Sequence, residues 1–464
     1  MKHKFLVAAS SAIIPFISAM CFAENTLSVE ASSASAYWEG ANASGAIVKE
    51  ENCPVVLEKE RINLNISSLP REGKVELTSY TSEAVAEYTF YNPENRAVDM
   101  TLLFPFGVFP SYMQKGAADE ISTVSVDGEA VKCRVRYTYA SSAFDAETDA
   151  ARVLDEKKTD AFYREDTSVR EYRFTLSKPD AVADTLKIKL AYNPKKTRVI
   201  FPSQGTRLCV ADGDMYAYTP MSGTRNKSAV FYAVGEAPAE VTPNLYEVVE
   251  AGAVLSEPVV REMTFSEFAL SSWRADLGVG EIDWYNAVVD MLNDKRGSGG
   301  SVDCFSLKSK DLMRWYEYNV KVPAGQRVVS RVKSPLYPTV DGSKNPRYEY
   351  SYLLSPAAKW ADFGQLEICI ETPYLLSNGS LEFTKEEKAD GEGYTYLFTR
   401  SSLPQGELTF VLTENDAADS DFSVYDNSFL RPSTTWAFVT LTVLASVAAL
   451  VTIIAVVTLR KKNQ

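Results

Sequence analysis

A period of two in the hydrophobic pattern is the feature that most constrains the fold of this chain. In RINLNI, Ile62, Leu64 and Ile66 alternate with polar residues, which places the three apolar side chains on one face of an extended strand. The same alternation recurs in AEYTFYNP, AVDMTLLFPFG, TLKIKLAY and QLEICIETP, and Pro or Gly often ends a segment. Such strands are typical of antiparallel sheets packed face to face. We therefore predict a mainly β protein with two antiparallel β-sandwich-like modules.

Short helical insertions interrupt the alternation. Residues 141–163 are acidic early and basic later, which suits a helix dipole. In EIDWYNAVVDMLNDKRGSGG, Tyr285, Val288, Val289 and Leu292 recur at helical spacing, and the Gly-rich stretch at 297–300 is expected to end the helix. Asp127 and Gly128 separate two alternating segments and predict a tight hairpin, because both residue types tolerate positive φ. We expect two helices and one tight turn among the strands.

These patterns predict the order of domains along the chain. The expected parts are a signal peptide (1–23), an N-terminal β-sandwich-like domain (24–245) with a helical insertion near 141–163, a helical connecting region (246–311), a C-terminal β-sandwich-like domain (312–414), a stalk (415–433), a transmembrane helix (434–459) and a cytoplasmic tail (460–464).

Both ends of the chain have the pattern of targeting segments. A basic start, an apolar run and the small residues Cys21 and Ala23 predict a secretory signal peptide, with a lipoprotein signal at Cys21 as the alternative. Residues 436–459 carry no charge, and a basic tail follows. This pattern predicts a single-pass cell-membrane protein with its N-terminal ectodomain outside and a short tail in the cytoplasm. RPSTTW loosely matches a wall-sorting signal, so wall anchoring is the alternative localisation.

Charge and histidine content exclude several classes of function. The chain has 48 basic and 61 acidic residues, and this balance disfavours nucleic acid as a partner. The single histidine, His3, lies in the predicted signal peptide, so the mature chain would lack His-dependent triads and His-ligated metals. Asp212 and Asp214 are too few acids for a calcium loop. We expect no cofactor and no metal site.

The cysteines give no metal or disulfide framework. Five of them follow the predicted signal peptide, and they are widely spaced with no CxxC pair. This spacing excludes a zinc ribbon and a small disulfide-stapled domain. Long-range disulfides and free thiols both remain open from the sequence.

Two phrases carry a resemblance to known proteins. FPFG after an Asn-Pro turn, and LLSPAAKWADFG before an alternating strand, resemble uncharacterised secreted or membrane-anchored surface proteins of Gram-positive bacteria. The resemblance covers most of the ectodomain loosely. It implies a bacterial cell-surface protein and assigns no functional residue.

LLSPAAKWADFG admits two interpretations. In the first it is a structural corner, in which Pro356 opens a short helical turn and Trp360 fills the core. In the second, Trp360 is exposed as a platform for a sugar ring, with Asp362 as its polar partner. The sequence favours the corner, because every residue of the phrase has a structural role in it.

Basic residues gather on two predicted strands of this acidic chain. Lys132, Arg134 and Arg136 share one side of a strand, and Lys187 and Lys189 share one side of another. If these strands were neighbours, they would form a cationic surface for an anionic wall polymer or an acidic partner. The alternative is a solvated face whose charges pair with acids across strands.

These observations favour a non-catalytic binding or adhesion role toward a glycan, a wall polymer or another surface protein. No catalytic motif is found. A carboxylate-based glycan hydrolase is one alternative and needs two carboxylates about 5–10 Å apart. Asp362, Glu367 and Glu371 are close enough in the chain to be considered for it. A structural subunit of a surface complex is the other alternative.

Overall fold

The predicted targeting segments fall outside the part of the chain that can be described. The computed structural model describes residues 43–50, 52–69, 82–107, 123–140, 146–176, 183–202, 206–211, 214–220, 228–248, 255–294, 307–308, 312–340, 347–389 and 391–413. The predicted signal peptide, stalk, transmembrane helix and tail all lie outside these ranges. Inside them, no helix has both the length and the apolar character needed to cross a membrane.

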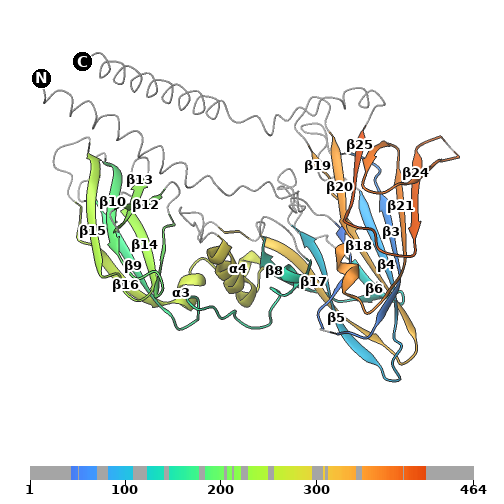
Figure 1. The fold of residues 1–464 in the computed structure, drawn as a ribbon, viewed down its shortest axis with the longest axis horizontal. Helices are drawn as coiled ribbons and strands as arrows, with labels where there is room; N and C mark the ends of the chain where they lie inside the picture. The colour runs from blue at the N-terminus through green and yellow to red at the C-terminus, as the bar shows by residue number, and fades with distance from the viewer. Residues whose placement is uncertain are drawn as a thin grey trace, which may run out of the picture. The chain divides into compact units, whose positions relative to one another are not determined.

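The described chain is mainly β, as predicted (Figure 1). Strands from both ends of the described sequence build one group of sheets, which we call the outer module. Its longest sheet has the strand order β23 (Thr384–Glu387), β24 (Tyr394–Arg400), β21 (Phe363–Thr372), β3 (Val56–Asn65), β4 (Glu83–Tyr91), β18 (Arg327–Pro335), β6 (Thr123–Val126) and β7 (Glu129–Val131).

Two further sheets complete the outer module. One contains β1 (Ala43–Ser44), β20 (Tyr348–Leu353), β25 (Leu408–Thr413) and β22 (Leu375–Gly379), with β19 (Thr339–Val340) paired to β20. The other has the order β2 (Ile47–Val48), β5 (Val98–Gly107), β17 (Leu312–Val322) and β8 (Arg134–Tyr139). Inward side chains of all three sheets share one apolar core, which includes Ile62, Phe90, Phe104, Tyr350 and Ile368.

Strand β3 is where the alternating pattern of RINLNI lies, and it has two partners. It pairs antiparallel with β4, where Ile62 is opposite Ala86. It pairs parallel with β21, where Ile62 is opposite Ile368. The purely antiparallel expectation is therefore wrong for β3 and β21. Period-two alternation reports which face of a strand is buried, and it is the same for both pairing directions.

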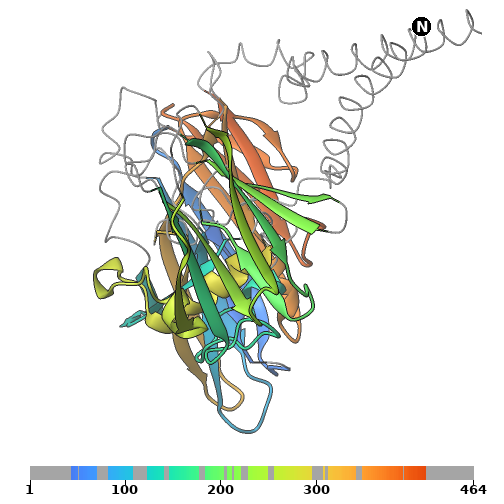
Figure 2. The same ribbon diagram turned by 90° about the vertical axis from the view of Figure 1, so that its left-hand side faces the viewer.

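A second group of strands, β9 to β16, forms what we call the inserted module (green in Figures 1 and 2). One of its sheets has the order β12 (Arg207–Ala211), β13 (Asp214–Pro220), β10 (Ala183–Ala191) and β15 (Glu240–Val248). The other has the order β11 (Thr197–Ile200), β14 (Ser228–Gly235), β9 (Ser168–Thr175) and β16 (Val259–Thr264). Alternate residues of both sheets, such as Ile188, Phe174 and Phe231, meet in one core.

Short helices connect the two modules. They are α2 (Ala146–Ala150), α3 (Phe265–Ala269), the 3₁₀ turn η3 (Ala275–Leu277) and α4 (Glu281–Asp294). Helix α4 is buried almost all round. Its apolar residues share a core with Val234 of β14, Tyr137 of β8 and Leu312 of β17. The helix predicted in EIDWYNAVVDMLNDKRGSGG is thus confirmed over Glu281–Asp294, and it contacts strands of both modules.

The strand pairing corrects the predicted division of the chain. We expected 24–245 and 312–414 to form separate sheets. Instead β17 pairs with β5 and β8, β18 pairs with β4, and β21 pairs with β3, so both ranges contribute to the same sheets. Residues 168–264 interrupt the outer module as an insertion. The reason is that hydrophobic periodicity identifies a strand but does not identify its partner.

Two local predictions have different outcomes. Asp127 and Gly128 have φ values of 49° and 85° and connect β6 to β7, as predicted for a tight hairpin. The helix expected over 141–163 is wrong for most of its length, because α2 covers only Ala146–Ala150 and residues 151–163 are irregular. Charge asymmetry without apolar residues at helical spacing is a weak helix signal.

Candidate functional site

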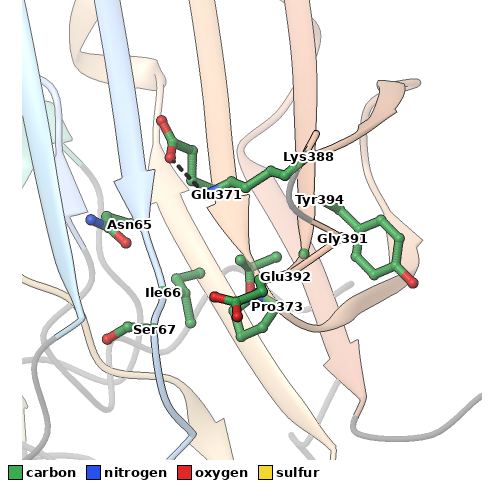
Figure 3. A pocket seen from close by; sticks show the side chains of 11 residues that line it. Asn65, Ile66, Ser67, Glu371, Pro373, Lys388, Gly391, Glu392 and Tyr394 are labelled. Carbon is green, nitrogen blue, oxygen red and sulfur yellow. Dashed lines mark hydrogen bonds and ion pairs between the residues drawn. The ribbon is translucent and has the colours of Figure 1, made fainter.

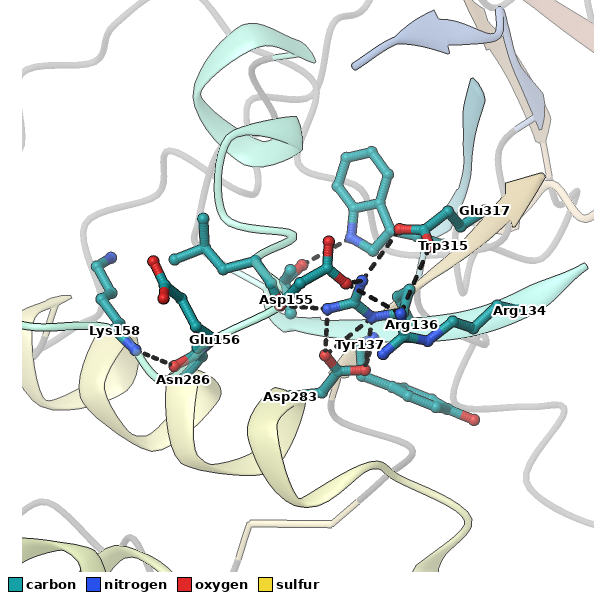
Figure 4. Close-up of polar contacts among 12 residues, drawn as sticks. Arg134, Arg136, Tyr137, Asp155, Glu156, Lys158, Asp283, Asn286, Trp315 and Glu317 are labelled. Atoms are coloured by element: carbon teal, nitrogen blue, oxygen red, sulfur yellow. Dashed lines mark hydrogen bonds and ion pairs between the residues drawn. The ribbon is translucent and has the colours of Figure 1, made fainter. Parts of the chain in front are cut away.

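The basic residues predicted on β8 do not form an open cationic surface (Figure 4). Lys132 is exposed in the connection between β7 and β8. Arg134 is exposed and forms an ion pair of 2.9 Å with Asp155. Arg136 is 1 % exposed, and its guanidinium binds Asp283, Asp155 and Glu317 at about 3.0 Å each.

Arg136 is therefore the centre of a buried group of ion pairs, which we call the Arg136 junction, and it is not exposed to bind a ligand. Burial alone would lower its pKa, but the hydrogen bond and charge of Asp283, and the charges of Glu317 and Asp155, outweigh burial and raise it. Hydrogen bonding from Lys49 is the main cause that lowers the pKa of Asp155. The charges in this cluster satisfy one another, which leaves little attraction for an external anion.

One polar stripe of α4 holds the irregular segment that follows α2. Asp283, Asn286 and Asp290 lie at helical spacing and are all buried. Asn286 Oδ1 accepts a hydrogen bond of 2.7 Å from the backbone N–H of Lys158, and Asp290 forms an ion pair with the Lys158 ammonium. These contacts explain why polar residues occupy a helix that is otherwise surrounded by apolar side chains.

The other two predicted basic residues lie in a different sheet. Lys187 and Lys189 belong to β10 of the inserted module, whereas β8 belongs to the outer module. The Lys189 ammonium contacts Asp214 at 3.1 Å and Glu240 at 3.3 Å. The Lys187 ammonium instead lies 4.4 Å from the ring centre of Tyr216. The single cationic surface expected from neighbouring strands is therefore not formed.

Trp360 is a core residue. It is 6 % exposed, and its ring centre lies 4.6 Å from that of Phe90. The preceding turn, η6 (Ser355–Lys359), carries Pro356 in its first turn, as the corner interpretation requires. Gly364 allows β21 to approach β3, because a Cβ there would lie 2.1 Å from the carbonyl oxygen of Glu58. The sugar-platform interpretation of Trp360 is corrected by this burial.

Asp362 and Glu367, also considered from the sequence, have local structural roles. Asp362 is exposed, and its carboxylate accepts a hydrogen bond of 2.9 Å from the N–H of Phe363. Glu367 contacts Lys59 at 2.6 Å and Arg61 at 2.9 Å. The hydrogen bond from Lys59 is the main cause that lowers the pKa of Glu367. A carboxylate held ionised in this way is unsuited to act as a general acid.

One described carboxyl group, that of Glu60, has the raised pKa that a general acid needs, but it lies in the protein interior. Glu60 of β3 is fully buried, and burial raises its pKa to about 8. The Tyr352 hydroxyl donates to Glu60 Oε1 at 3.0 Å, and the Tyr88 hydroxyl lies 3.1 Å from that of Tyr352. Oε2 has no hydrogen-bond partner among the described residues. Without access to solvent, Glu60 cannot meet a substrate, so its role is structural.

A polar cavity lies where β3 and β21 end and β24 begins (Figure 3); we call it the strand-end cavity. Its volume is about 520 Å³, within the usual range for small-molecule sites of about 300–1,000 Å³. It is lined by Asn65, Ile66, Ser67, Glu371, Thr372, Pro373, Lys388, Gly391, Glu392, Gly393 and Tyr394.

The parallel pairing of β3 and β21 creates this cavity. Asn65 is opposite Glu371 at the ends of the two strands, and Tyr394 is opposite Thr372 at the start of β24. The backbone N–H of Ile66 donates to the carbonyl of Glu371 at 2.9 Å, which fixes the two strand ends together. Residues from distant parts of the sequence therefore line one wall of the cavity.

A tight turn between β23 and β24 forms the other wall. The N–H of Lys388 donates to the carbonyl of Gly393 at 2.9 Å, and the N–H of Gly391 donates to that of Lys388 at 2.9 Å. Gly393 has a φ of 136°, and a Cβ there would lie 2.7 Å from the carbonyl oxygen of Thr372. Only glycine satisfies both conditions, so this position fixes how closely the turn approaches β21.

The lining groups suit a ligand with many hydroxyl groups. Asn65, Ser67 and Glu392 supply amide, hydroxyl and carboxylate groups, and the half-buried Tyr394 adds an aromatic side chain. The Lys388 ammonium binds the Glu371 carboxylate at 3.0 Å, which balances one of the negative charges. Figure 3 shows this ion pair, with Asn65 at the end of β3, Ile66 and Ser67 just beyond it, and Tyr394 on another strand.

Metal binding has no support in the described part of the chain. No group of three or more His, Cys, Asp or Glu side chains there is arranged to hold a metal ion. Asp212 lies outside the described residues, and Asp214 is paired with Lys189. Cys53, Cys133, Cys209 and Cys369 are free thiols, and Cys304 lies outside the described residues.

From the sequence, one residue of this cavity was considered, Glu371, and it was grouped with Asp362 and Glu367 as a possible hydrolase carboxylate. The available signal was GEGYTY, in which Gly391 and Gly393 precede the aromatic start of a strand. Closely spaced glycines before a strand indicate an unusual turn. They do not indicate that the turn lies beside the end of β3.

Comparisons with known proteins give no family for this chain. No protein-family model matches it, and no curated protein matches it. Among solved structures, one from Legionella pneumophila, provisionally described as a nutrient-binding protein, is similar over 81% of this chain and 71% of its own, with 10% sequence identity and a TM-score of 0.35. That similarity is too low to carry an argument about fold or function.

Proposed function

We propose that this chain is a single-pass membrane protein whose β-rich ectodomain binds a glycan outside the cell without transforming it. The pattern of residues 1–23 supports export, and the uncharged run within 434–459 with its basic tail supports anchoring in the membrane. The resemblance to Gram-positive surface proteins supports display on a bacterial cell. The described strands form two groups of sheets, although each group draws on other ranges of the chain than the sequence predicted.

The strand-end cavity is the observation that carries the binding role. A glycan offers alternating donors and acceptors together with an apolar ring face. Asn65 and Ser67 supply hydrogen-bonding groups for the donors and acceptors of the glycan, and Tyr394 supplies an aromatic ring for its apolar face. The turn that forms one wall is held by backbone hydrogen bonds and by a glycine at positive φ. A wall held in this way is largely formed before the ligand arrives, which reduces the entropy lost on binding.

The test is a thermal-shift screen of the full-length chain in mild detergent against neutral oligosaccharides. A ligand that binds only the folded chain stabilises it by about 2.7 kcal/mol at a hundred times its dissociation constant. We expect Tyr394→Ala and Asn65→Ala to abolish the shift. Tyr91→Ala is the matched control, because Tyr91 is opposite Val56 at the other end of β3. A shift that survives Tyr394→Ala, or a flat panel, would contradict a glycan site in this cavity.

A glycan hydrolase is the second candidate, because Glu371 and Glu392 both line the cavity. The ion pair of Glu371 with Lys388 argues against it, since a nucleophile or base must be available to the substrate. Release of reducing ends from any bound oligosaccharide, lost in both Glu371→Gln and Glu392→Gln, would establish this alternative in place of simple binding.

A further inference from the structure

The outward face of the sheet β12-β13-β10-β15 has an unusual composition. Leu186, Ile188 and Leu190 of β10 point into the core of the inserted module. Because successive side chains of a strand point to opposite faces, Lys187 and Lys189 point outward. This face lies on the inserted module, and its residues are not shared with the strand-end cavity.

Cross-strand register places four residues of this face in one row. Lys187 is opposite Asn244 of β15 on one side and opposite Tyr218 of β13 on the other. Tyr218 is in turn opposite Arg207 of β12. The row therefore runs Asn244, Lys187, Tyr218, Arg207 across the whole sheet. With strands about 4.8 Å apart, the backbones of the two basic residues are about 10 Å apart.

The neighbouring row differs in charge. It contains Lys189 opposite Tyr216, and Lys189 is neutralised by Asp214 and Glu240. The two rows meet at Tyr216, whose ring contacts Lys187. The basic charge of this face is therefore concentrated in the row of Lys187 and Arg207.

Lys187 and Arg207 are basic residues of this face that no acid among the described residues neutralises. Among the described residues, no carboxylate lies within ion-pair distance of either one. The Lys187 ammonium lies 4.4 Å from the ring centre of Tyr216 and 5.7 Å from that of Tyr218. The electron-rich ring faces hold the ammonium in place without removing its charge. Arg207 is exposed.

We propose that this row, which we call the tyrosine–lysine row (Asn244, Lys187, Tyr218, Arg207, with Tyr216 beside Lys187), binds an acidic polysaccharide. Two cations about 10 Å apart match repeated carboxylates or sulfates along an extended polymer. The tyrosines between them offer apolar ring surface for the faces of sugar residues, and Asn244 offers an amide for hydroxyl groups. The whole chain has a net charge of −13, which repels polyanions in general, so an acidic polymer needs a local group of unneutralised cations such as this row to bind.

The experiment measures binding of the full-length chain in mild detergent to polygalacturonate, with dextran sulfate, neutral dextran and poly-L-glutamate as comparison polymers. We expect polygalacturonate or dextran sulfate to bind, with affinity that falls as NaCl rises. Neutral dextran tests whether charge is required, and poly-L-glutamate tests whether sugar is required.

Variants then locate the site. Lys187→Ala/Arg207→Ala should weaken polysaccharide binding about tenfold or more, equivalent to the loss of about 1.4 kcal/mol. Lys196→Ala/Arg274→Ala is the matched control for charge, because both residues are basic, exposed and paired with acids elsewhere. Asn244→Ala is a second, conservative change in the row and should weaken binding less than the double variant.

Substitution of the two tyrosines tests whether the ligand is a polysaccharide or an acidic polypeptide. Tyr216→Ala/Tyr218→Ala should weaken polysaccharide binding in a chain that melts as the wild type does. If poly-L-glutamate binds as well as the polysaccharides and the tyrosine variant has no effect, the row recognises acidic polypeptide and the proposal is overturned. Equal loss in the Lys196/Arg274 control, or no binding by any acidic polysaccharide, also overturns it.

Discussion

At the scale of single residues, Glu60 makes the stability of this protein depend on pH. Its folded pKa is about 8 because of burial, against 4.5 in an unfolded chain. The folded state therefore holds a proton that the unfolded state has released, so the contribution of Glu60 to stability is complete below about pH 4.5 and is lost as pH rises to about 8. At about 1.4 kcal/mol per pKa unit, the loss amounts to a few kcal/mol.

Glu60→Gln should remove this dependence while keeping the size of the side chain. We expect the free energy of unfolding, measured in urea, to fall by a few kcal/mol between about pH 5.5 and 8 in the wild type. In the variant it should change less over the same pH range. Glu349→Gln, an exposed carboxylate on the same strand as Tyr352, should follow the wild-type profile. Parallel pH profiles for wild type and Glu60→Gln would show that Glu60 is ionised at neutral pH.

At the scale of elements, the Arg136 junction joins α4 to β8 and β17. Arg136→Met would leave Asp283 buried at 6 % exposure without its cation, and breaking a buried ion pair in this way costs about 3–5 kcal/mol. Arg134 is the matched control on the same strand, since it shares Asp155 but is 57% exposed. Arg134→Met should cost about 1 kcal/mol or less. Urea unfolding midpoints compare the two, and equal losses would contradict the structural role of Arg136.

The elements also show what the sequence can and cannot predict. Alternation in RINLNI identified the buried face of β3, and helical spacing identified α4. Arg136 was misread as a surface charge because its partner Asp283 lies on a helix far along the chain. The same limit applies to the strand-end cavity, where Asn65 and Glu371 meet through a parallel pairing that periodicity does not encode. Side-chain patterns are local, whereas these sites depend on which elements become neighbours.

At the scale of the whole described chain, the order of strands in space decides which fragments can fold. The division suggested by periodicity, residues 24–245, contains β3, β4 and β5 but lacks β21, β18 and β17, which pair with them. It also lacks β16, which pairs with β9 in the inserted module. Each of its two groups of strands would therefore expose apolar faces and unpaired backbone groups.

We therefore expect a fragment of residues 24–245 to show no cooperative unfolding transition by circular dichroism and to be digested rapidly by protease. The chain 24–433, which contains every described strand, should show a cooperative transition under the same conditions, because β17 to β25 complete the outer module. Cooperative unfolding of the short fragment with native-like protection would mean that the first range folds independently. That result would contradict the interleaved pairing of β3 with β21, which forms the strand-end cavity, and of β8 with β17, which brings Glu317 to Arg136.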